Sequence, residues 1–313
     1  MQRRATLLHQ IRQFFYARKV LEVETPLLSQ CSGTDPQLDF FTTTYSAPPV
    51  QQTLFLQTSP EFAMKRLLAA GCGSIYQITK AFRNGEAGRF HNPEFTLLEW
   101  YRVGFGFAQL MDEIEALITE LFADTALLQA TERVSYQAVF ARHTGLNALV
   151  FDVSAYSAYA LVHQLPEAIS LCGDAHNLWL DFLFSHQVQP FLGVDGLCMV
   201  YGYPVCQSSL ARINVDNPLV TDRVEIFING VELGNGYFEL TDALEQNHRF
   251  DQEIAVRTHE GLPAVTKDTR LLAALDAGLP MCSGMAIGLD RLLMLLMQCQ
   301  AIDEVLCFSL HRA

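Results

Sequence analysis

Residues 82–101 read FRNGEAGRFHNPEFTLLEWY, a stretch with two arginines, one histidine, two asparagines and three glutamates. The runs on both sides of the loop GEAGRFHNP are apolar and β-prone, which predicts two strands joined by a loop. A guanidinium group on a rigid strand suits phosphate oxygens, because its planar fork binds two of them at once. Arg83 is therefore a candidate phosphate ligand, and Phe95 could stack on a nucleobase. The alternative is that the arginines only pair with Glu86, Glu94 and Glu99.

A second segment, RVEIFINGVELGNGY at 223–237, is predicted to form a β-hairpin, because Asn229-Gly230 lies between two β-type runs. With a two-residue turn, Glu225 lies diagonal to Glu232 on one face, within roughly 7–8 Å at the backbone. Such carboxylates repel each other unless a cation lies between them. Mg²⁺ usually takes one or two carboxylates and completes its shell with phosphates. The alternative is an acidic pair that faces solvent.

The composition of the 313-residue chain narrows the functional class. Lys and Arg number 21 against 34 Asp and Glu, for a formal charge of −13. A protein that binds nucleic acid over a wide surface usually has the opposite balance. The eight cysteines form no CxxC or Cys/His cluster, which argues against a zinc site. No P-loop and no complete dinucleotide fingerprint occur, so any ATP must be held by side chains on a sheet.

The N-terminus lacks the apolar run of a signal peptide, and RLLMLLMQC at 291–299 is too short to span a bilayer. The sequence therefore predicts a cytoplasmic protein with no membrane association.

The apolar pattern along the chain predicts helices and strands in alternating blocks. Helices are expected at 4–19, 109–122, 241–260 and from Ser59-Pro60-Glu61 to Gly71, with 131–190 mostly helical. Strands are expected at 75–84, 94–103 and about 198–206, and SGMAIGLDRLLMLLMQ (283–298) reads as a strand that runs into a buried helix. The two glycines of GNGYFEL (234–240) are expected to break the hairpin register and to re-aim Asn235 and Glu239. This pattern predicts an α+β fold with an antiparallel sheet flanked by helices.

Four segments in this order resemble a known family. Residues 82–101 resemble motif 2 of class II aminoacyl-tRNA synthetases of the lysyl type, in which FRNE and HNPEFT recur. ARKVLEVETPLL (17–28) resembles motif 1, GMAIGLDRLL (284–293) resembles motif 3, and VELGNGYFELTDALEQ (231–246) is similar to the lysyl segment between motifs 2 and 3. The resemblance implies one catalytic domain over residues 1–313, an antiparallel sheet flanked by helices, and a homodimer through motif 1.

The resemblance also implies roles for individual residues. Arg83 would neutralise the α-phosphate of ATP, and Arg291 the γ-phosphate, as the two catalytic residues. The remaining nucleotide ligands would be Asn84, Glu86, His91, Asn92, Phe95, Glu232, Leu233 and Gly288. Glu225 and Glu232 would hold Mg²⁺. The amino-acid pocket would be lined by Ser59, Pro60, Glu61, Tyr101, Asn235, Glu239 and Ala286. Two acids in that pocket suit a diamino substrate, since a buried ammonium group needs a counter-charge.

Departures from the lysyl pattern indicate which relatives are nearest. The chain begins at the motif 1 helix, with no anticodon-binding domain, and Ala286 stands where lysyl enzymes usually carry glycine. An added methyl group at a pocket wall would change the choice of amino acid. The chain thus resembles the stand-alone paralogues of lysyl-tRNA synthetase that pass an (R)-β-lysyl group to elongation factor P. We expect (R)-β-lysine or lysine as substrate and elongation factor P as acceptor, and tRNA is not an expected partner.

Three alternatives remain open at this point. A truncated lysyl-tRNA synthetase would charge tRNA with lysine. A non-catalytic regulatory paralogue would bind a partner without activating any amino acid. A free-standing amide synthetase that uses ammonia resembles the same fold, but its acidic substrate does not suit a pocket with Glu61 and Glu239.

Overall fold

The computed structural model describes residues 1–194 and 196–313, which form two compact units. The first unit contains Met1–Gly106 and Glu239–Ala313, and the second contains Phe107–Phe238. Each unit combines helices with strands that are mostly antiparallel, which confirms the predicted α+β class. None of the helices in the described part of the chain has the length and apolar character needed to cross a membrane.

The main strands of the first unit lie in the order β1 (Leu21–Glu22), β5 (Ile75–Phe82), β6 (Glu94–Val103) and β11 (Cys282–Gly288). β1 is parallel to β5, and the other two pairs are antiparallel. β6 and β11 pair Tyr101 with Gly284 and Glu99 with Ala286. Because side chains alternate across a strand, these four positions adjoin one another on a single face of the sheet.

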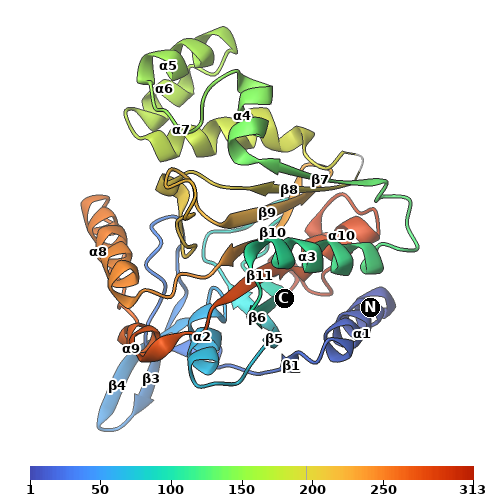
Figure 1. Cartoon of the computed structure of the whole chain (residues 1–313). Helices are drawn as coiled ribbons and strands as arrows, with labels where there is room; N and C mark the ends of the chain where they lie inside the picture. Colours follow the sequence, from blue (N-terminus) through green and yellow to red (C-terminus); the bar gives the residue numbers. More distant parts are fainter. Residues whose placement is uncertain (195) are drawn as a thin grey trace. The chain divides into compact units, whose positions relative to one another are not determined.

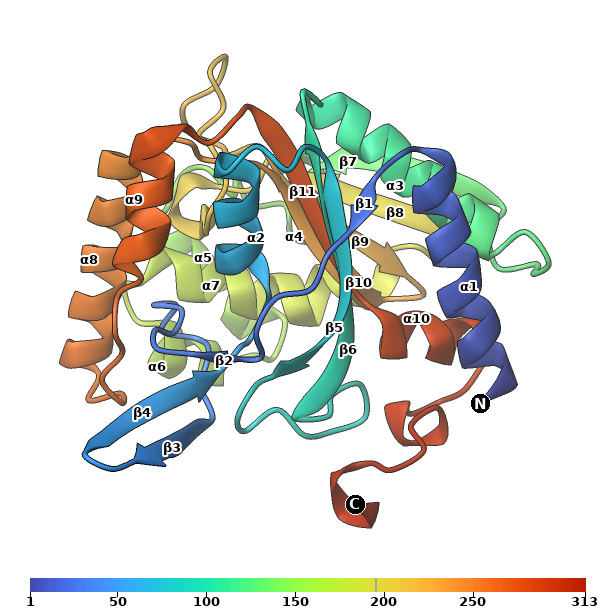
Figure 2. The same cartoon turned by 90° about the horizontal axis from the view of Figure 1, so that it is seen from below.

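Five helices of the described first unit surround these strands: α1 (Gln2–Ala17), α2 (Glu61–Ala69), α8 (Ala243–His259), α9 (Thr269–Gly278) and α10 (Leu289–Leu296). Figure 2 shows α2, α8 and α9 side by side, and α1 next to α10. The ring of Phe15 on α1 stacks on Tyr76 at 4.5 Å and lies 5.4 Å from the ring of Trp100. The apolar side of α1 therefore packs on β5 and β6.

The helix ends follow local capping chemistry. The Asp242 carboxylate accepts hydrogen bonds from the backbone N–H groups of Leu244 and Glu245 at the start of α8. Asp268 does the same at the start of α9. Such caps satisfy N–H groups that have no partner within the helix.

Three features of the fold differ from the sequence-based expectations. A small antiparallel sheet, β2 (Leu28–Ser29), β4 (Val50–Leu56) and β3 (Thr42–Ala47), was not predicted, because most of its residues are exposed and polar. α9 was also not predicted. β7 (Ala130–Ser135) lies at the start of a region that was expected to be mostly helical.

The strands of the second unit lie in the order β10 (Val231–Phe238), β9 (Arg223–Ile228), β8 (Gly196–Tyr201) and β7, of which only β7 and β8 pair in parallel among the described residues. Asn229 and Gly230 have φ angles of 51° and 72°, as a tight hairpin turn requires. The register shifts between Glu232 and Gly234, which confirms the predicted break. As a result, Glu225 faces Asn235 directly.

The helices of the second unit are α3 (Phe107–Leu121), α4 (Tyr136–Thr144), α5 (Val153–Val162), α6 (Glu167–Cys172) and α7 (His176–Leu183). Figure 1 shows α4 to α7 gathered together beside β7 and β8. Their shared core contains the fully buried rings of Tyr136, Phe140, Tyr156 and Trp179. The helical content predicted for residues 131–190 is therefore confirmed, apart from β7.

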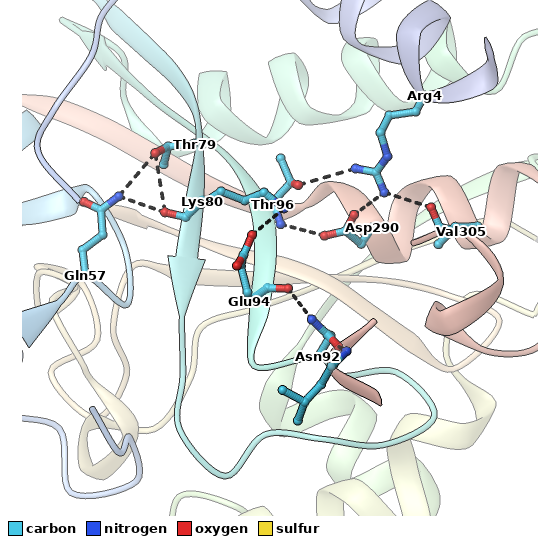
Figure 3. A network of polar contacts seen from close by, with 10 residues as sticks. Arg4, Gln57, Thr79, Lys80, Asn92, Glu94, Thr96, Asp290 and Val305 are labelled. Carbon is cyan, nitrogen blue, oxygen red and sulfur yellow. Dashed lines mark hydrogen bonds and ion pairs between the residues drawn. The ribbon is translucent and has the colours of Figure 1, made fainter. Parts of the chain in front are cut away.

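A buried ion pair joins three elements of the first unit (Figure 3). Arg4 on α1 pairs with Asp290 at the start of α10, and their side chains are 18% and 2% exposed. The second carboxylate oxygen of Asp290 accepts a hydrogen bond of 2.6 Å from the backbone N–H of Thr96 on β6. Arg4 also donates to the backbone oxygen of Val305 at 3.3 Å. This network fixes α10, and with it the neighbouring Arg291, against β6.

Removal of the Arg4 charge should destabilise the protein strongly. Arg4→Met leaves Asp290 buried without its cation, and we expect the free energy of unfolding to fall by about 3–5 kcal/mol. Arg12→Met is the matched control on the same helix, because the pair of Arg12 with Glu22 is 48% and 40% exposed. That variant should lose at most about 1 kcal/mol. Urea unfolding measures both values, and equal losses would contradict the assignment.

Candidate active site

The first unit brings three carboxylates together, of which Glu99 and Glu239 are buried and Glu61 is half-buried. Glu61 lies in the first turn of α2, Glu99 lies on β6, and Glu239 directly follows β10. The Nζ atom of Lys65 is 2.7 Å from Glu61 Oε1 and 2.6 Å from Glu239 Oε2. The side chains of Lys65 and Glu239 are 2% and 1% exposed. The structure thus brings together the two acids assigned to the amino-acid pocket, and places between them a lysine that the sequence analysis missed.

Glu99 is a second residue of this cluster that the sequence analysis did not assign to the pocket. Its carboxylate accepts hydrogen bonds from Ser59 Oγ at 2.8 Å and from the Tyr101 hydroxyl at 2.7 Å. Ser59 Oγ also accepts the N–H of Glu61 at 3.0 Å, so it fixes the start of α2 directly after Pro60. The sequence signal that could have identified Glu99 is the alternation of side chains along a strand. Glu99 and Tyr101 are two residues apart on β6, so their side chains lie on the same face.

Two of these carboxyl groups hold their protons more tightly than usual. Burial raises the pKa of Glu99 to about 8, and the charge of Glu61 adds to this effect. Burial also raises the pKa of Glu239 to about 7, although the Lys65 ammonium lowers it. Any further cation that enters the cluster favours the ionised forms. We therefore call Glu61, Lys65, Glu99 and Glu239 the acid cluster and regard it as a candidate ammonium-binding site.

β11 forms one wall of the acid cluster with residues that have small or no side chains. A Cβ atom at Gly284 would lie 2.4 Å from the Tyr101 ring and 2.7 Å from Glu239 Oε1, so this position requires glycine. Ala286 pairs with Glu99 across the two strands. Side chains opposite each other in an antiparallel pair have Cβ atoms about 4.5–5.5 Å apart. The methyl group of Ala286 therefore lies beside the base of the Glu99 side chain.

Arg83 lies at the end of β5 among the predicted nucleotide ligands. Its guanidinium carbon is 5.1 Å from the centre of the Phe95 ring, and its NH1 atom is 3.7 Å from Glu86. Arg83 thus pairs with a glutamate, as the alternative prediction stated, but the distance between Arg83 and Glu86 is longer than a normal hydrogen bond. Its Nε atom is buried and has no hydrogen-bond partner within the described residues. Arg83 therefore retains a donor for an anionic group.

Arg291 contacts the loop between β5 and β6. Its Nε atom donates to the backbone oxygen of Phe90 at 3.1 Å, and its NH2 atom lies 2.5 Å from Nε2 of His91. Arg291 lies in the first turn of α10, directly after Asp290, and Gly288 precedes that helix. The structure thus brings the arginine of motif 3 to the loop of motif 2.

Two predicted nucleotide ligands have side chains that bind other parts of the protein. Asn84 Nδ2 donates to Asp39 at 2.6 Å. Asn92 Nδ2 donates to the backbone oxygen of Glu94 at 2.6 Å, and its Oδ1 accepts the N–H of Leu310 at 3.0 Å. Asn92 also lines a separate cavity of about 720 Å³ between α1, β5, β6 and the C-terminal segment. The nucleotide roles of both asparagines stay predictions.

The predicted metal ligands lie in the second unit. The Glu225 carboxylate accepts hydrogen bonds from the Tyr203 hydroxyl at 2.6 Å and from Arg223 at 2.5 Å. Burial raises the pKa of Glu225, the Arg223 charge opposes this, and the nearby Glu232 charge raises it further. With a side chain 13% exposed, Glu225 does not face solvent as the alternative prediction required. Arg223 was not predicted as its partner.

The donor set around Glu225 and Glu232 is small. Within residues 1–194 and 196–313, no three or more His, Cys, Asp and Glu side chains are placed to hold a metal ion. Two interacting carboxylates fit Mg²⁺ that shares its shell with phosphates, rather than a site built only from protein. Asn235 lies opposite Glu225 on β10, and the side chain of Leu233 is buried in the core.

Comparisons with known proteins agree with this geometry. The family model for class II tRNA synthetases (D, K and N) matches residues 1–312. The chain is 42% identical over 313 residues to the elongation factor P–(R)-β-lysine ligase of Hamiltonella defensa, covering 99% of this chain and 95% of that protein. It is 44% identical over 312 residues to the ligase of the same name from Pasteurella multocida, covering 99% and 94%.

The ligase of the same name from Enterobacter sp. is 44% identical over 313 residues, covering 99% of this chain and 95% of that protein. These matches extend over nearly the whole chain. The chain therefore belongs to the class II tRNA synthetase family of the D, K and N type, together with the elongation factor P–(R)-β-lysine ligases.

Proposed function

We propose that this chain activates (R)-β-lysine with ATP and transfers the β-lysyl group to the ε-amine of a lysine on elongation factor P. The acid cluster is the observation that carries this proposal, because its carboxylates lie in the same unit as Arg83 and Arg291. The names of the relatives support the same reaction.

The acid cluster suits a substrate with two ammonium groups. Glu61 would bind the ammonium group nearer the reacting carboxylate, and Glu239 the distal one. Glu99 adds a third carboxylate, whose present partners are the neutral hydroxyls of Ser59 and Tyr101. A substrate with a single ammonium group would leave more buried carboxylate charge uncompensated, which costs several kcal/mol for an ion removed from water.

Activation requires no protein nucleophile. An oxygen of the substrate carboxylate attacks the α-phosphorus of ATP, and the bond from that phosphorus to the departing pyrophosphate breaks. Arg83 would stabilise the charge that develops on the α-phosphate, and Arg291 would hold the γ-phosphate. The rate enhancement comes from positioning and from preorganised charge, as in other transfers at phosphorus.

The remaining nucleotide contacts are proposed from the resemblance to the family. Phe95 would stack on the adenine ring, with Glu86, His91 and Asn92 around the nucleotide, together with Asn84, Leu233 and Gly288. Glu225 and Glu232 would hold Mg²⁺, which neutralises phosphate charge when it is bound.

In the transfer step, the lysine ε-amine attacks the carbonyl carbon of the adenylate. A carbon–nitrogen bond forms, the bond from that carbon to the phosphate oxygen breaks, AMP leaves, and the amine releases a proton. The formal charge of −13 does not favour tRNA as the acceptor. We place the reaction in the cytoplasm, where translation factors and ATP occur. The homodimer through residues 17–28 stays a prediction.

The function can be tested with the purified chain by ATP–pyrophosphate exchange. We expect faster exchange with (R)-β-lysine than with lysine, because the Ala286 methyl group narrows the pocket beside Glu99. Incubation with elongation factor P should then add the mass of one β-lysyl group to a lysine, as mass spectrometry measures. Charging of tRNA instead would favour a truncated lysyl-tRNA synthetase. No exchange with any diamino acid would favour a non-catalytic paralogue.

Arg291→Ala should block adenylate formation while the fold persists. The variant loses the cation proposed for the γ-phosphate, and loss of one such group typically lowers the rate about 10²–10³-fold. Pyrophosphate exchange measures this loss, and circular dichroism with thermal melting checks the fold. Arg312→Ala is a suitable control, because Arg312 is an exposed arginine at the C-terminus that bonds Ser309 and the backbone of Asp303. Full activity of Arg291→Ala would refute the role assigned to motif 3.

Ala286→Gly should shift the choice between the two lysine isomers. Removal of the methyl group opens space beside Glu99, so we expect the ratio of kcat/KM for lysine to that for (R)-β-lysine to rise about 10-fold. Exchange kinetics with both amino acids measure the ratio, and the KM for ATP serves as an internal control. An unchanged ratio would show that Ala286 does not form the discriminating wall.

A further inference from the structure

Lys65 has no role in the reaction described above, yet it is among the most deeply buried charged groups of the first unit. Its side chain is 2% exposed, and a lysine is rarely so buried unless it is paired. Burial lowers the pKa of Lys65, but Glu239 and Glu61 raise it by more, so the ammonium group stays charged. The lysine lies four residues after Glu61 on α2, while Glu239 comes from a distant part of the chain.

The charges of the acid cluster do not balance without a ligand once all three carboxylates are ionised. Lys65 then compensates one of them, which leaves two negative charges. Because the pKa values of Glu239 and Glu99 are raised, the unliganded cluster reaches this state only as the pH rises through about 7 and about 8. Among the described residues, Glu99 is bonded by the hydroxyls of Ser59 and Tyr101 and pairs with no cation, whereas the Glu239 carboxylate has Lys65 and the backbone N–H of Gly284. Two uncompensated charges equal the number of ammonium groups on a diamino acid.

We propose that Lys65 is a positioning residue that fixes both the separation of Glu61 and Glu239 and the number of cationic groups the pocket accepts. The contact distances of 2.7 and 2.6 Å hold the two carboxylates on either side of one nitrogen atom. With Lys65 in place, two ammonium groups complete the charge balance. Without it, three carboxylates face each other and a diamino acid no longer neutralises them. The statement that the pocket accepts two ammonium groups rests on the proposed function, whereas the statement about the charges of the unliganded acid cluster does not.

The proposal has a pH signature in the unliganded protein. Titratable groups face the cluster from every adjoining element, namely Glu61 on α2, Glu99 and Tyr101 on β6, Glu239 after β10, and Cys282 on β11. The pKa values of Glu239 and Glu99 are raised to about 7 and about 8, so the folded protein binds more protons than the unfolded chain above about pH 4.5. Stability from these groups is therefore present at low pH and is lost as the pH rises through both values.

Lys65→Met tests this signature by thermal melting without any substrate. Removal of the cation raises the pKa of Glu239 further, because the Lys65 ammonium lowers it in the native protein, so stability continues to fall at a higher pH than in the native protein. We expect the Tm deficit of the variant, relative to the native chain, to grow by about 4 °C or more between about pH 5.5 and about pH 8.5. Lys267→Met is the matched control, because its partner Asp251 is 56% exposed. Its deficit should be small and independent of pH.

The double variant Lys65→Met/Glu239→Gln removes one charge of each sign and so restores the original balance. It should recover most of the pH-dependent deficit of Lys65→Met, and it should fold even if the single variant does not. A role of Lys65 in packing alone predicts a deficit that is the same at every pH. Such a constant deficit, or a double variant less stable than Lys65→Met, would overturn the proposal.

Kinetics with (R)-β-lysine add a second readout in the assembled enzyme. We expect Lys65→Met to raise the KM for the diamino acid about 10-fold at neutral pH, and we expect this KM to return toward the native value as the pH approaches about 9. The KM for ATP should change less than about twofold. Equal changes in both KM values would count against a positioning role. If the native chain activates no diamino acid, the proposed function fails, while the melting data still decide the role of Lys65.

Discussion

The structure depends on one constraint, which is that a carboxylate removed from water needs a compensating cation or several hydrogen-bond donors. Among the described residues, three carboxylates discussed above meet this constraint with cations of the chain itself. Asp290 is compensated by Arg4, Glu239 by Lys65, and Glu225 by Arg223. At two of the three, the partners come from elements far apart in the sequence, so the pair holds the tertiary arrangement as well as the charge.

Glu99 is the informative exception to this rule. Its side chain is buried, but its partners among the described residues are the hydroxyls of Ser59 and Tyr101, which stabilise a carboxylate without neutralising it. A ligand cation therefore gains more from this position than from a carboxylate that already has an arginine or lysine beside it. Within the acid cluster, Glu239 would share its charge between Lys65 and a ligand cation, whereas the charge of Glu99 would be compensated by the ligand alone.

The sequence predicted those features that depend on local chemistry. The Asn229-Gly230 hairpin and its register break follow from turn residues, and the helix after Glu61 follows from its start signals. Lys65 was missed because its burial depends on Glu239, which no local pattern places beside it. The strand at Ala130–Ser135 was missed for a similar reason. Its backbone pairs with β8, which is distant in the sequence, rather than with a strand joined to it by a short hairpin turn.

The geometry of the acid cluster is set in part by apolar packing on the opposite face of the sheet. Trp100 lies between Glu99 and Tyr101 on β6, is fully buried, and contacts Phe15 of α1. It pairs with Met285 of β11, which is also buried. A register slip of one residue would move the tryptophan into the pocket and the glutamate into the apolar core. Such a slip is unfavourable, because it would bury a carboxylate without a partner and remove the tryptophan ring from the core. The apolar contacts of Trp100 therefore fix which side chains of β6 face the acid cluster.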